Sequence, residues 1–528
     1  MPDQLIDKIF NIQGGFVTDI APQVRELTFL TKAENLLYEV SGAVRKVGGT
    51  TRINSTAITG SPSILGMFDF WLSGTGGTST QKFMAVTSDS KVYKEDMDGV
   101  FDDITGAATI TANAIPVFCQ DRDLLTIWFS TNDTPLKWNQ TGNVATLGGS
   151  PPAGRGAVFH VNRPWTWGAV ANPSRLTYGS STSAEDFTGG DTGSIDIEPE
   201  DGDRIIGAVS HKNNLFVFKG PYKGSIHVIS GRTVATFARD VLVRGIALQS
   251  HNSIVERGDD IWFKSDQGIH SLAATERFGN FTQAMVTPLH TKFFRDDINR
   301  NRFANVWGVN YGTKSSVIWT LTQVGASANN YPFGVSYIRP DLGLKPFTWP
   351  NRSCQSAAIR INPTTNIREL VFGENNGFVT RQDTATRTLA SGTAYNFRIR
   401  TPSVILVSTN AAGQPVGDQP VYLQDLFIRS RPVGNYDLTV GITRDNLAEQ
   451  SYTVNQGSTG AIWGTDVFGT GVFGGGILQT GYIAGPGLSG ECRAAIIDIQ
   501  QGGGSQDADI YEVGVRLNPS SQSRSATL

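Results

Sequence analysis

Short apolar runs recur along the middle of the chain, each followed by a polar turn and a second short run. Three clear examples are KFMAVTSDSKVYKED from Lys82, DLLTIWFSTNDTPLKWNQ from Asp123 and DDIWFKSDQGIHSLA from Asp259. The turns consist of Ser, Asn, Asp, Gly and Pro, which tolerate or preset turn dihedrals, so each unit predicts a β-hairpin. Three further units of this kind are ELVFGENNGFVTRQD from Glu369, RPWTWGAVANPSRLTYGS from Arg163 and NNLFVFKGPYKGSIHVIS from Asn213.

These hairpin units are spaced by about 40 to 50 residues, which fits the four-stranded blades of a β-propeller. Because one blade cannot bury both of its faces, radial packing of several blades would cover the Trp and Phe residues of the repeats. We therefore predict a central β-propeller of about six or seven blades over residues 54–390. The blade number depends on residues 281–302, which could form a helical insertion instead of a strand. Two-sheet sandwiches in series are the alternative fold.

Beyond the repeats, alternating strands predict a C-terminal antiparallel β-sandwich over residues 391–519. NYDLTVGITRD from Asn435 and DIYEVGVRL from Asp509 each place apolar side chains on one face. The Gly-rich residues 458–490 predict a long loop, which could form a tip, pack on a partner or be an ordinary surface loop. Residues 520–528 predict a disordered tail.

The first 53 residues predict an N-terminal arm. Thr31 can cap a one-turn helix over residues 33–37, with Glu34 at the capping-box position. Ser41 and Gly42 then predict the turn of a hairpin that ends near residue 49. Such an arm could brace the first blade or reach a neighbouring subunit.

Composition supports an all-β chain of more than one domain, because 528 residues exceed what one hydrophobic core usually organises. The 59 glycines and the low charged fraction of 17% favour short strands joined by tight turns. A net charge of -3 disfavours a surface that grips phosphates, although it leaves room for a surface past which DNA slides.

The cysteines and the N-terminus bear on the compartment of the protein. Cys119, Cys354 and Cys492 include no CxxC pair, so they predict neither a zinc site nor a disulfide framework. The N-terminus does not resemble a signal peptide, and no apolar run reaches the roughly 18 residues that cross a bilayer. We expect a soluble protein without a membrane anchor, made in the cytoplasm.

No motif for catalysis stands out. Phosphate-binding loops, the GxSxG elbow, HExxH helices, DxDxDG calcium loops and complete Asp boxes are missing from the sequence. Acidic doublets could suggest a glycosidase, but adjacent strand residues point to opposite faces, so solvated turns are the preferred interpretation for Asp102-Asp103, Asp259-Asp260 and Asp296-Asp297. The six histidines lack metal-ligand spacing and are interpreted as structural: His160, His211, His227, His251, His270 and His290. We predict a non-enzymatic protein with no catalytic, cofactor-binding or metal-binding residue.

Two longer blocks carry a more specific pattern. IQGGFVTDIAPQVRELTFLTKAENLLYEVSGAVRKVGG from Ile12 contains a double glycine at Gly14-Gly15, the pair Glu34-Asn35 and a hairpin at Gly42-Ala43-Val44-Arg45-Lys46. PPAGRGAVFHVNRPWTWGAVANPSRLTYGSSTSAEDF from Pro151 contains Pro152, Arg163, Trp165, Asn172-Pro173-Ser174-Arg175-Leu176 and Glu185-Asp186-Phe187. Both blocks resemble the nozzle, hub or packaged-DNA stabilisation proteins of short-tailed bacteriophage tails, although Pro164 stands where that family has a hydrophobic residue.

The resemblance implies a structural virion protein of the tail, with copies in a homohexameric ring around the channel through which genomic DNA leaves. It implies contacts with the portal or adaptor proteins and with tail fibres or spikes, and no sequence-specific DNA binding. It names no channel-lining residue. The alternative function is a carbohydrate-binding or carbohydrate-degrading propeller that uses the ten tryptophans as sugar platforms.

Overall fold

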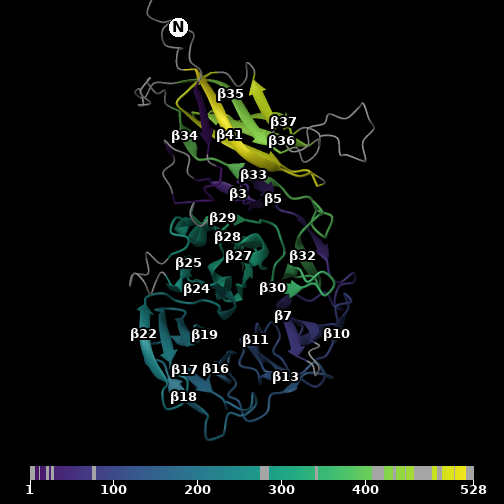
Figure 1. Ribbon diagram of the computed structural model, residues 1–528, viewed down its shortest axis with the longest axis vertical. Coiled ribbons are helices and arrows are strands. Elements are labelled where there is room, and N and C mark those ends of the chain that lie inside the picture. Colours follow the sequence, from purple (N-terminus) through teal and green to yellow (C-terminus); the bar gives the residue numbers. More distant parts are fainter. Residues whose placement is uncertain are drawn as a thin grey trace, which may run out of the picture.

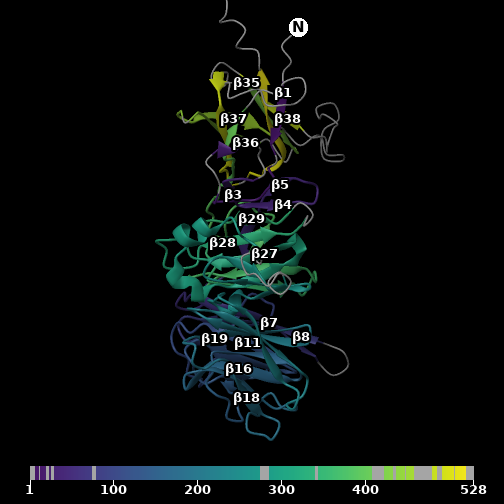
Figure 2. The ribbon, with the colours of Figure 1, turned by 90° about the vertical axis from the view of Figure 1, so that its left-hand side faces the viewer.

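The computed structural model is elongated, with a β-propeller at one end and a β-sandwich at the other (Figures 1 and 2). It describes residues 6–10, 12–19, 23–24, 29–73, 79–273, 285–338, 343–406, 421–431, 436–445, 447–456, 479–484, 490–504 and 506–518.

Seven small sheets stand around a common axis and form the propeller. Within each sheet the strands are antiparallel neighbours, and β30 of the last blade packs beside β7 of the first. Blade 1 consists of β7 (Ile64–Ser73), β8 (Ser79–Thr87), β9 (Lys91–Glu95) and β10 (Phe101–Asp103). Blade 2 consists of β11 (Pro116–Asp121), β12 (Leu124–Phe129), β13 (Leu136–Trp138) and β14 (Ala145–Thr146). Blade 3 consists of β15 (Gly156–His160), β16 (Arg163–Ala169), β17 (Asn172–Tyr178) and β18 (Gly193–Asp196). Blade 4 consists of β19 (Arg204–His211), β20 (Asn214–Gly220), β21 (Ser225–Ser230) and β22 (Ala238–Arg244).

The remaining three blades complete the ring. Blade 5 has three strands in the described part of the chain: β23 (Val255–Arg257), β24 (Asp260–Lys264) and β25 (Ile269–Ser271). Blade 6 consists of β26 (Gly308–Tyr311), β27 (Ser316–Leu321), β28 (Tyr331–Ser336) and β29 (Lys345–Thr348). Blade 7 consists of β30 (Ser356–Ile361), β31 (Arg368–Gly373), β32 (Val379–Thr384) and β6 (Gly49–Arg52). The predicted propeller is confirmed, and it has seven blades.

Each of the six hairpin units expected from the repeats is formed by the second and third strands of a blade. These pairs are β8–β9, β12–β13, β16–β17, β20–β21, β24–β25 and β31–β32. The first strand of each pair lies between two others and between adjacent blades, so both of its faces are covered. In β16, for example, every residue from Arg163 to Gly168 is buried. Continuous apolar runs are the pattern of strands covered on both faces.

The segment after blade 5 contains two short helical turns among its described residues. The turns η2 (Phe293–Asp297) and η3 (Arg300–Asn305) precede blade 6. They bury three phenylalanines against the core, namely Phe293, Phe294 and Phe303. Residues 274–284 lie outside the described residues. The helical alternative for residues 281–302 is therefore correct from residue 293 onward.

A strand from the N-terminal region closes the propeller. β6 is the outermost strand of blade 7 and pairs antiparallel with β32, with Arg52 opposite Thr380 and Thr51 opposite Arg381. Gly48 and Gly49 pass so close to residues 383–388 that an added Cβ would lie 2.2 and 2.1 Å from backbone oxygens. The predicted boundary between residues 53 and 54 was wrong in this respect, because it separates β6 from the blade that it completes.

The one-turn helix predicted over residues 33–37 is also wrong. These residues form β3 (Lys32–Glu34) and β4 (Leu36–Tyr38), separated by Asn35, which has a positive φ of 53°. The backbone N–H of Asn35 donates to the oxygen of Thr348, and the Thr31 hydroxyl donates to Arg400 instead of capping a helix. The predicted hairpin is confirmed: β4 pairs with β5 (Val44–Lys46) around Gly42.

Two sheets make up the C-terminal sandwich. One contains β35 (Val421–Ser430), β41 (Asp509–Asn518), β38 (Gln479–Ala484), β39 (Gly490–Cys492) and, from the N-terminal region, β1 (Ile6–Phe10), β4 and β5. The other contains β33 (Phe397–Arg400), β34 (Ser403–Ile405), β36 (Asp437–Arg444), β37 (Gln450–Asn455), β40 (Ala494–Gln501), β2 (Gln23–Val24) and β3. In β36 and β41 the alternating apolar residues predicted from the sequence are buried: Leu438, Val440, Ile442, Val513, Val515 and Leu517.

The prediction of a loop for the Gly-rich residues 458–490 was wrong for residues 479–484, which form β38 and pair with β35. Residues 457–478 and 485–489, and the predicted tail, lie outside the described residues.

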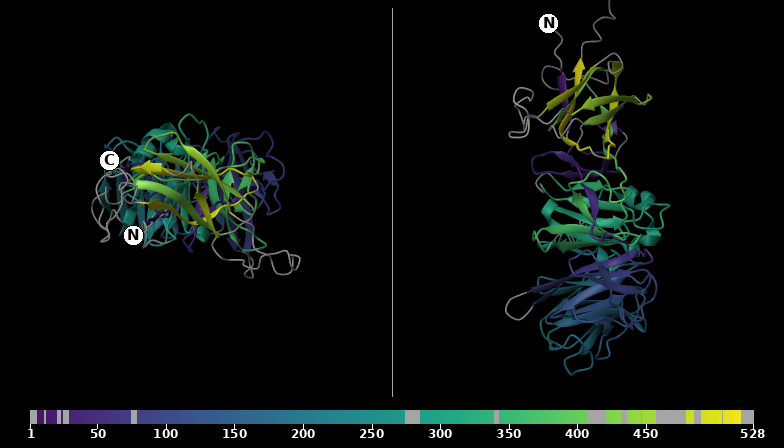
Figure 3. Two further views of the ribbon diagram at one scale, coloured as in Figure 1. Left: turned by 90° about the horizontal axis from the view of Figure 1, so that it is seen from above. Right: turned by 90° about the vertical axis from the view of Figure 1, so that its right-hand side faces the viewer.

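The two parts of the molecule share one sheet. β3 pairs parallel to β29 of blade 6 and antiparallel to β33 of the sandwich, so hydrogen bonding continues from one part to the other. Figure 3 shows these N-terminal strands, in purple, between the propeller and the sandwich. Buried Arg352 donates to the backbone oxygen of Gly48 at 3.1 Å, and the Trp349 indole donates to that of Leu36 at 3.1 Å. The N-terminal region is therefore the joint of the molecule and not a free arm.

Candidate functional site

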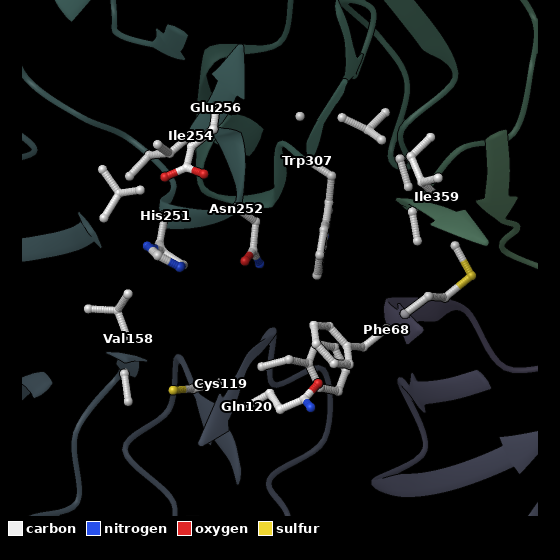
Figure 4. A pocket seen from close by; sticks show the side chains of 18 of the residues that line it. Phe68, Cys119, Gln120, Val158, His251, Asn252, Ile254, Glu256, Trp307 and Ile359 are labelled. Carbon is white, nitrogen blue, oxygen red and sulfur yellow. The ribbon is translucent and has the colours of Figure 1, made fainter. Parts of the chain in front are cut away.

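A cavity of about 650 Å³ lies on the propeller axis. Every blade contributes side chains to it, and Figure 4 shows them converging on a common space. Three consecutive residues of a strand span about 7 Å, which sets the depth of this axial cavity. It is lined by residues 67–69, 118–120, 157–159, 208–210, 307–309 and 357–359, together with His251, Asn252, Ile254 and Glu256.

A turn closes one end of the axial cavity. The turn η1 (His251–Ser253) precedes blade 5, and the Asn252 side-chain amide donates across the axis to the backbone oxygen of Pro116 in blade 2 at 3.0 Å. Trp307 of blade 6 reaches the same region, where its ring lies against Gly66 of blade 1. A second cavity of about 250 Å³ shares His251 and Asn252 with the first. The turn therefore lies between the two cavities.

The wall of the axial cavity combines aromatic, aliphatic and polar side chains, two of them acidic. Phe68 and Phe118 stack with ring centroids 5.4 Å apart. Asp69 accepts hydrogen bonds from the Gln81 side chain at 2.8 Å and from the backbone N–H of Ile361 at 3.0 Å. Burial raises the pKa of the Asp69 carboxyl. Burial also raises the pKa of Glu256, although nearby His211 acts in the opposite direction.

Polar contacts between blades surround one rim of this cavity. The His160 ring bonds the Ser210 hydroxyl at 2.8 Å and joins blades 3 and 4. The Gln120 amide donates to the oxygen of Trp71 and joins blades 2 and 1. His211 lies 3.8 Å from Glu256 and links blades 4 and 5. These contacts fix the ends of the inner strands and connect neighbouring blades in the ring of seven blades.

Most of the histidines considered from the sequence are buried and structural. Burial lowers the pKa of five of them to about 4, so they are neutral at pH 7: His160, His227, His251, His270 and His290. His227 bonds Ser225 within its own blade at 2.9 Å. His290 bonds the backbone oxygen of Phe16 and anchors the N-terminal region. His251 and His211 are the two that approach the axial cavity.

The three cysteines are free and lie in the core. Burial raises the pKa of Cys119 and of Cys492 to about 12, and it also raises the pKa of Cys354. A thiol with so high a pKa is a poor nucleophile at neutral pH.

The acidic doublets are dispersed over the surface. Asp102 and Asp103 pair with Lys94 and Lys91 of the adjacent strand at 3.4 and 2.6 Å. Asp260 accepts hydrogen bonds from the Trp262 indole and the Ser271 hydroxyl, which fixes the hairpin of blade 5.

Asp259 is solvent-exposed, and Asp296 pairs with Arg295. Within the described part of the chain, no three His, Cys, Asp or Glu side chains gather in a way that could hold a metal ion.

A charged cleft of about 390 Å³ lies where the N-terminal hairpin, blade 7 and the sandwich meet. Arg45 bonds Glu39 at 3.0 Å and Asp383 at 3.2 Å. Arg431 bonds buried Asp509 at 2.5 Å. Since these cations are paired with carboxylates of adjacent elements, the cleft stabilises the joint.

The innermost strands that build the axial cavity were not found from the sequence. Two of these strands share a similar sequence that is not part of a hairpin pattern: Gly-Ala-Val-Phe-His at residues 156–160 and Gly-Ala-Val-Ser-His at residues 207–211. Small residues recur there because seven strands converge near the axis, where little space is left for side chains. Among the described residues, no helix is long and apolar enough to span a bilayer.

No protein-family model matches the chain, and no curated protein matches it. The β-propeller domain of Cps50 (Swd1) from Myceliophteria thermophila is 12% identical, with 63% of this chain and 99% of that chain covered and a TM-score of 0.37. BamB from Moraxella catarrhalis is 10% identical, with 70% and 100% covered and a TM-score of 0.36. The extracellular domain of BT4673 from B. thetaiotaomicron is 8% identical, with a TM-score of 0.33. That alignment covers 87% of this chain but only 45% of the other. With scores this low, the fold assignment depends on the strand pairing described above.

Proposed function

We propose that this chain is a structural subunit of a short-tailed bacteriophage tail, in the nozzle or hub position, where copies form a ring around the exiting DNA. One observation carries the proposal. The two blocks of sequence that resemble this family supply the framework of the molecule: the joint between its two parts, and blade 3 with its link to blade 2.

The first block builds the joint between propeller and sandwich. Asn35 adopts its positive φ where β3 leaves the shared sheet, and its side-chain amide donates to the oxygen of Asn396 at 2.8 Å. Gly42 turns the β4–β5 hairpin with a φ of 89° that other residues rarely adopt. Buried Lys46 donates to Gln501 of the sandwich at 2.7 Å. Each of these matching residues serves the attachment of one part to the other.

The second block builds blade 3 and its link to blade 2. Arg163 is buried, donates to the oxygens of Gly179 and Asp191, and lies over the Tyr178 ring. Trp165 is fully buried beside Tyr178, with ring centroids 4.8 Å apart. Glu185 bonds Lys137 of blade 2. Such residues would be retained in a family whose members share this framework.

The shape of the subunit suits a component that bears mechanical load. A sheet that continues through both parts leaves no flexible linker between them, so force on the sandwich is carried into the propeller. The axial cavity of about 650 Å³ is too small for a duplex about 20 Å wide, so the DNA would have to pass between copies. A net charge of -3 gives such a ring little tendency to grip phosphates.

The alternative, a carbohydrate-binding or carbohydrate-degrading propeller, would need exposed aromatic platforms. Eight of the ten tryptophans are buried in the core: Trp128, Trp138, Trp165, Trp167, Trp262, Trp307, Trp319 and Trp349. Trp71 is half-buried, and Trp463 lies outside the described residues. The tryptophans are accounted for by packing, so they lend this alternative no support.

Electron microscopy of the purified chain, and of the particles that contain it, tests the proposal. We expect six copies in a ring around a channel at least about 20 Å wide, the diameter of the duplex. The sandwich or the propeller should contact the protein above it in the tail. A chain that stays monomeric in those particles, or that cleaves a polysaccharide as an isolated monomer, would overturn the proposal.

A further inference from the structure

The axial cavity has the make-up of a receptor for an organic cation. Ligand sites are mostly apolar pockets of roughly 300 to 1,000 Å³ with a few polar groups that set specificity, and a cavity of about 650 Å³ falls in this range. Side chains from all seven blades line the cavity, and η1 lies at one end of it. The binding properties of this cavity do not depend on the proposed tail function.

Aromatic rings form much of the wall. Phe68 and Phe118 stand together in a stack at an interplanar angle of 21°, while Phe159 and Trp307 come from other blades. The faces of aromatic rings carry partial negative charge and attract ammonium groups at close range. The same rings give an alkyl chain an apolar surface on which to lie.

Two carboxylates complete the wall, Asp69 from blade 1 and Glu256 from blade 5. Figure 4 shows the carboxylate of Glu256 on the same side of the cavity as His251. The cation nearest to Glu256 is the His211 ring at 3.8 Å, which is charged only when protonated. Among the described residues that line the cavity there is neither Lys nor Arg. The described wall therefore carries two carboxyl groups and no Lys or Arg side chain of its own, while Arg360 acts on Asp69 and His211 on Glu256 from behind the wall.

We propose that the axial cavity binds an alkylammonium ion, with the charged nitrogen near Asp69 or Glu256 and the alkyl chain against the phenylalanine wall. The ammonium gains from a carboxylate and from ring faces in a partly water-excluded space, where charges interact more strongly than in water. Anions such as phosphates and nucleotides are excluded by the same carboxylates. The alkylammonium can be a free amine or the side chain of a lysine.

Isothermal titration calorimetry on the intact chain tests the site with hexylamine as the probe. Hexanol and hexanoate, which have the same chain length, test the neutral and the negative head group. We expect hexylamine to bind and the other two to bind at least about tenfold more weakly, which corresponds to one close charge contact.

Isosteric variants locate the binding. Glu256→Gln removes one charge and keeps a polar side chain opposite His211, and we expect it to weaken hexylamine binding about tenfold. Asp69→Asn should act in the same direction, with circular dichroism to verify that the blade still folds. Asp240→Asn makes the same charge change on exposed strand β22, away from the cavity, and should leave the affinity unchanged.

Two further probes distinguish the sources of the cation. A free source is indicated if 1,5-diaminopentane binds and Nα-acetyl-lysine methylamide does not, and the reverse result indicates a lysine side chain of a partner. Either result supports the cation site. Equal binding of hexylamine and hexanol, or full affinity in the double variant Asp69→Asn/Glu256→Gln, would overturn it.

Discussion

The ion pair between Arg360 and Glu95 closes the propeller ring from within. Arg360 lies on β30 of blade 7 and Glu95 on β9 of blade 1, and the guanidinium donates to both carboxylate oxygens at 3.2 and 3.0 Å. The Glu95 side chain is fully buried and that of Arg360 is 8% exposed. Glu95 also accepts from the backbone N–H of Gly99 at 2.8 Å. The pair thus joins the two blades at which the chain enters and leaves the ring.

Removing one partner leaves the other charge buried without its counter-charge, which typically costs about 3 to 5 kcal/mol. For Glu95→Gln we expect about 3 kcal/mol, the lower end of that range, because Glu369 lies 3.8 Å from Arg360 and remains. Arg360→Met should cost a similar amount. The double variant should cost clearly less than the two single losses combined, since it leaves no unpaired charge in the core.

Denaturant unfolding followed by tryptophan fluorescence measures these changes, with a double-mutant cycle to isolate the coupling between the two side chains. Arg175→Met in the exposed pair of Arg175 and Asp196 serves as the matched control and should change little. Additive losses in the cycle, or an unaltered midpoint for Glu95→Gln, would refute the reasoning that this pair ties blade 7 to blade 1.

Three further outcomes follow from buried groups. Burial lowers the pKa of His270 to about 4, whereas an unfolded histidine has a pKa of about 6.5. The unfolded chain therefore binds the extra proton first, and the stability of the fold should decrease as the pH drops from about 6.5 to about 4. His270→Phe should flatten this decline in acid-unfolding curves, and an unchanged slope would exclude a contribution from this ring. Gly48→Ala should lower the melting temperature because its Cβ would lie 2.2 Å from the oxygen of Thr384, whereas Gly190→Ala, with open space around it, should not; equal melting temperatures would contradict the close approach. Deletion of residues 1–49 should abolish cooperative unfolding, since it removes β3, β4 and β5 from the joint, and a truncated chain that unfolds as sharply as the intact one would show that the joint is dispensable.

Local pattern was sufficient for the middle of each blade. The strand LLTIWF of blade 2 and the strand SVIWTL of blade 6 are mostly apolar and almost entirely buried, because other strands and neighbouring blades cover both faces. Turn residues such as Asn132, which has a positive φ of 62°, mark where those strands end. The innermost strands were missed because they alternate between the axial cavity and the core and are rich in small residues. The residues of the cavity were missed with them.

The N-terminal region shows where local pattern fails. TKAENLL has the capping residues of a helix, yet Thr348 and Arg400 accept hydrogen bonds from Asn35 and Thr31 and make the segment a strand. Backbone partners more than 300 residues away in the sequence leave no trace in the local order of polar and apolar side chains.

The sequence alone determined that this chain consists of short strands, that most of them pair in hairpins and that these hairpins recur at blade spacing, because burial and turn chemistry act over a few neighbouring residues. The tertiary structure decided the number of blades, the closure of the ring by β6 and the joint through β3, because each depends on pairing between distant segments. It also decided the axial cavity, since Asp69 of blade 1 and Glu256 of blade 5 line one cavity only when the ring closes.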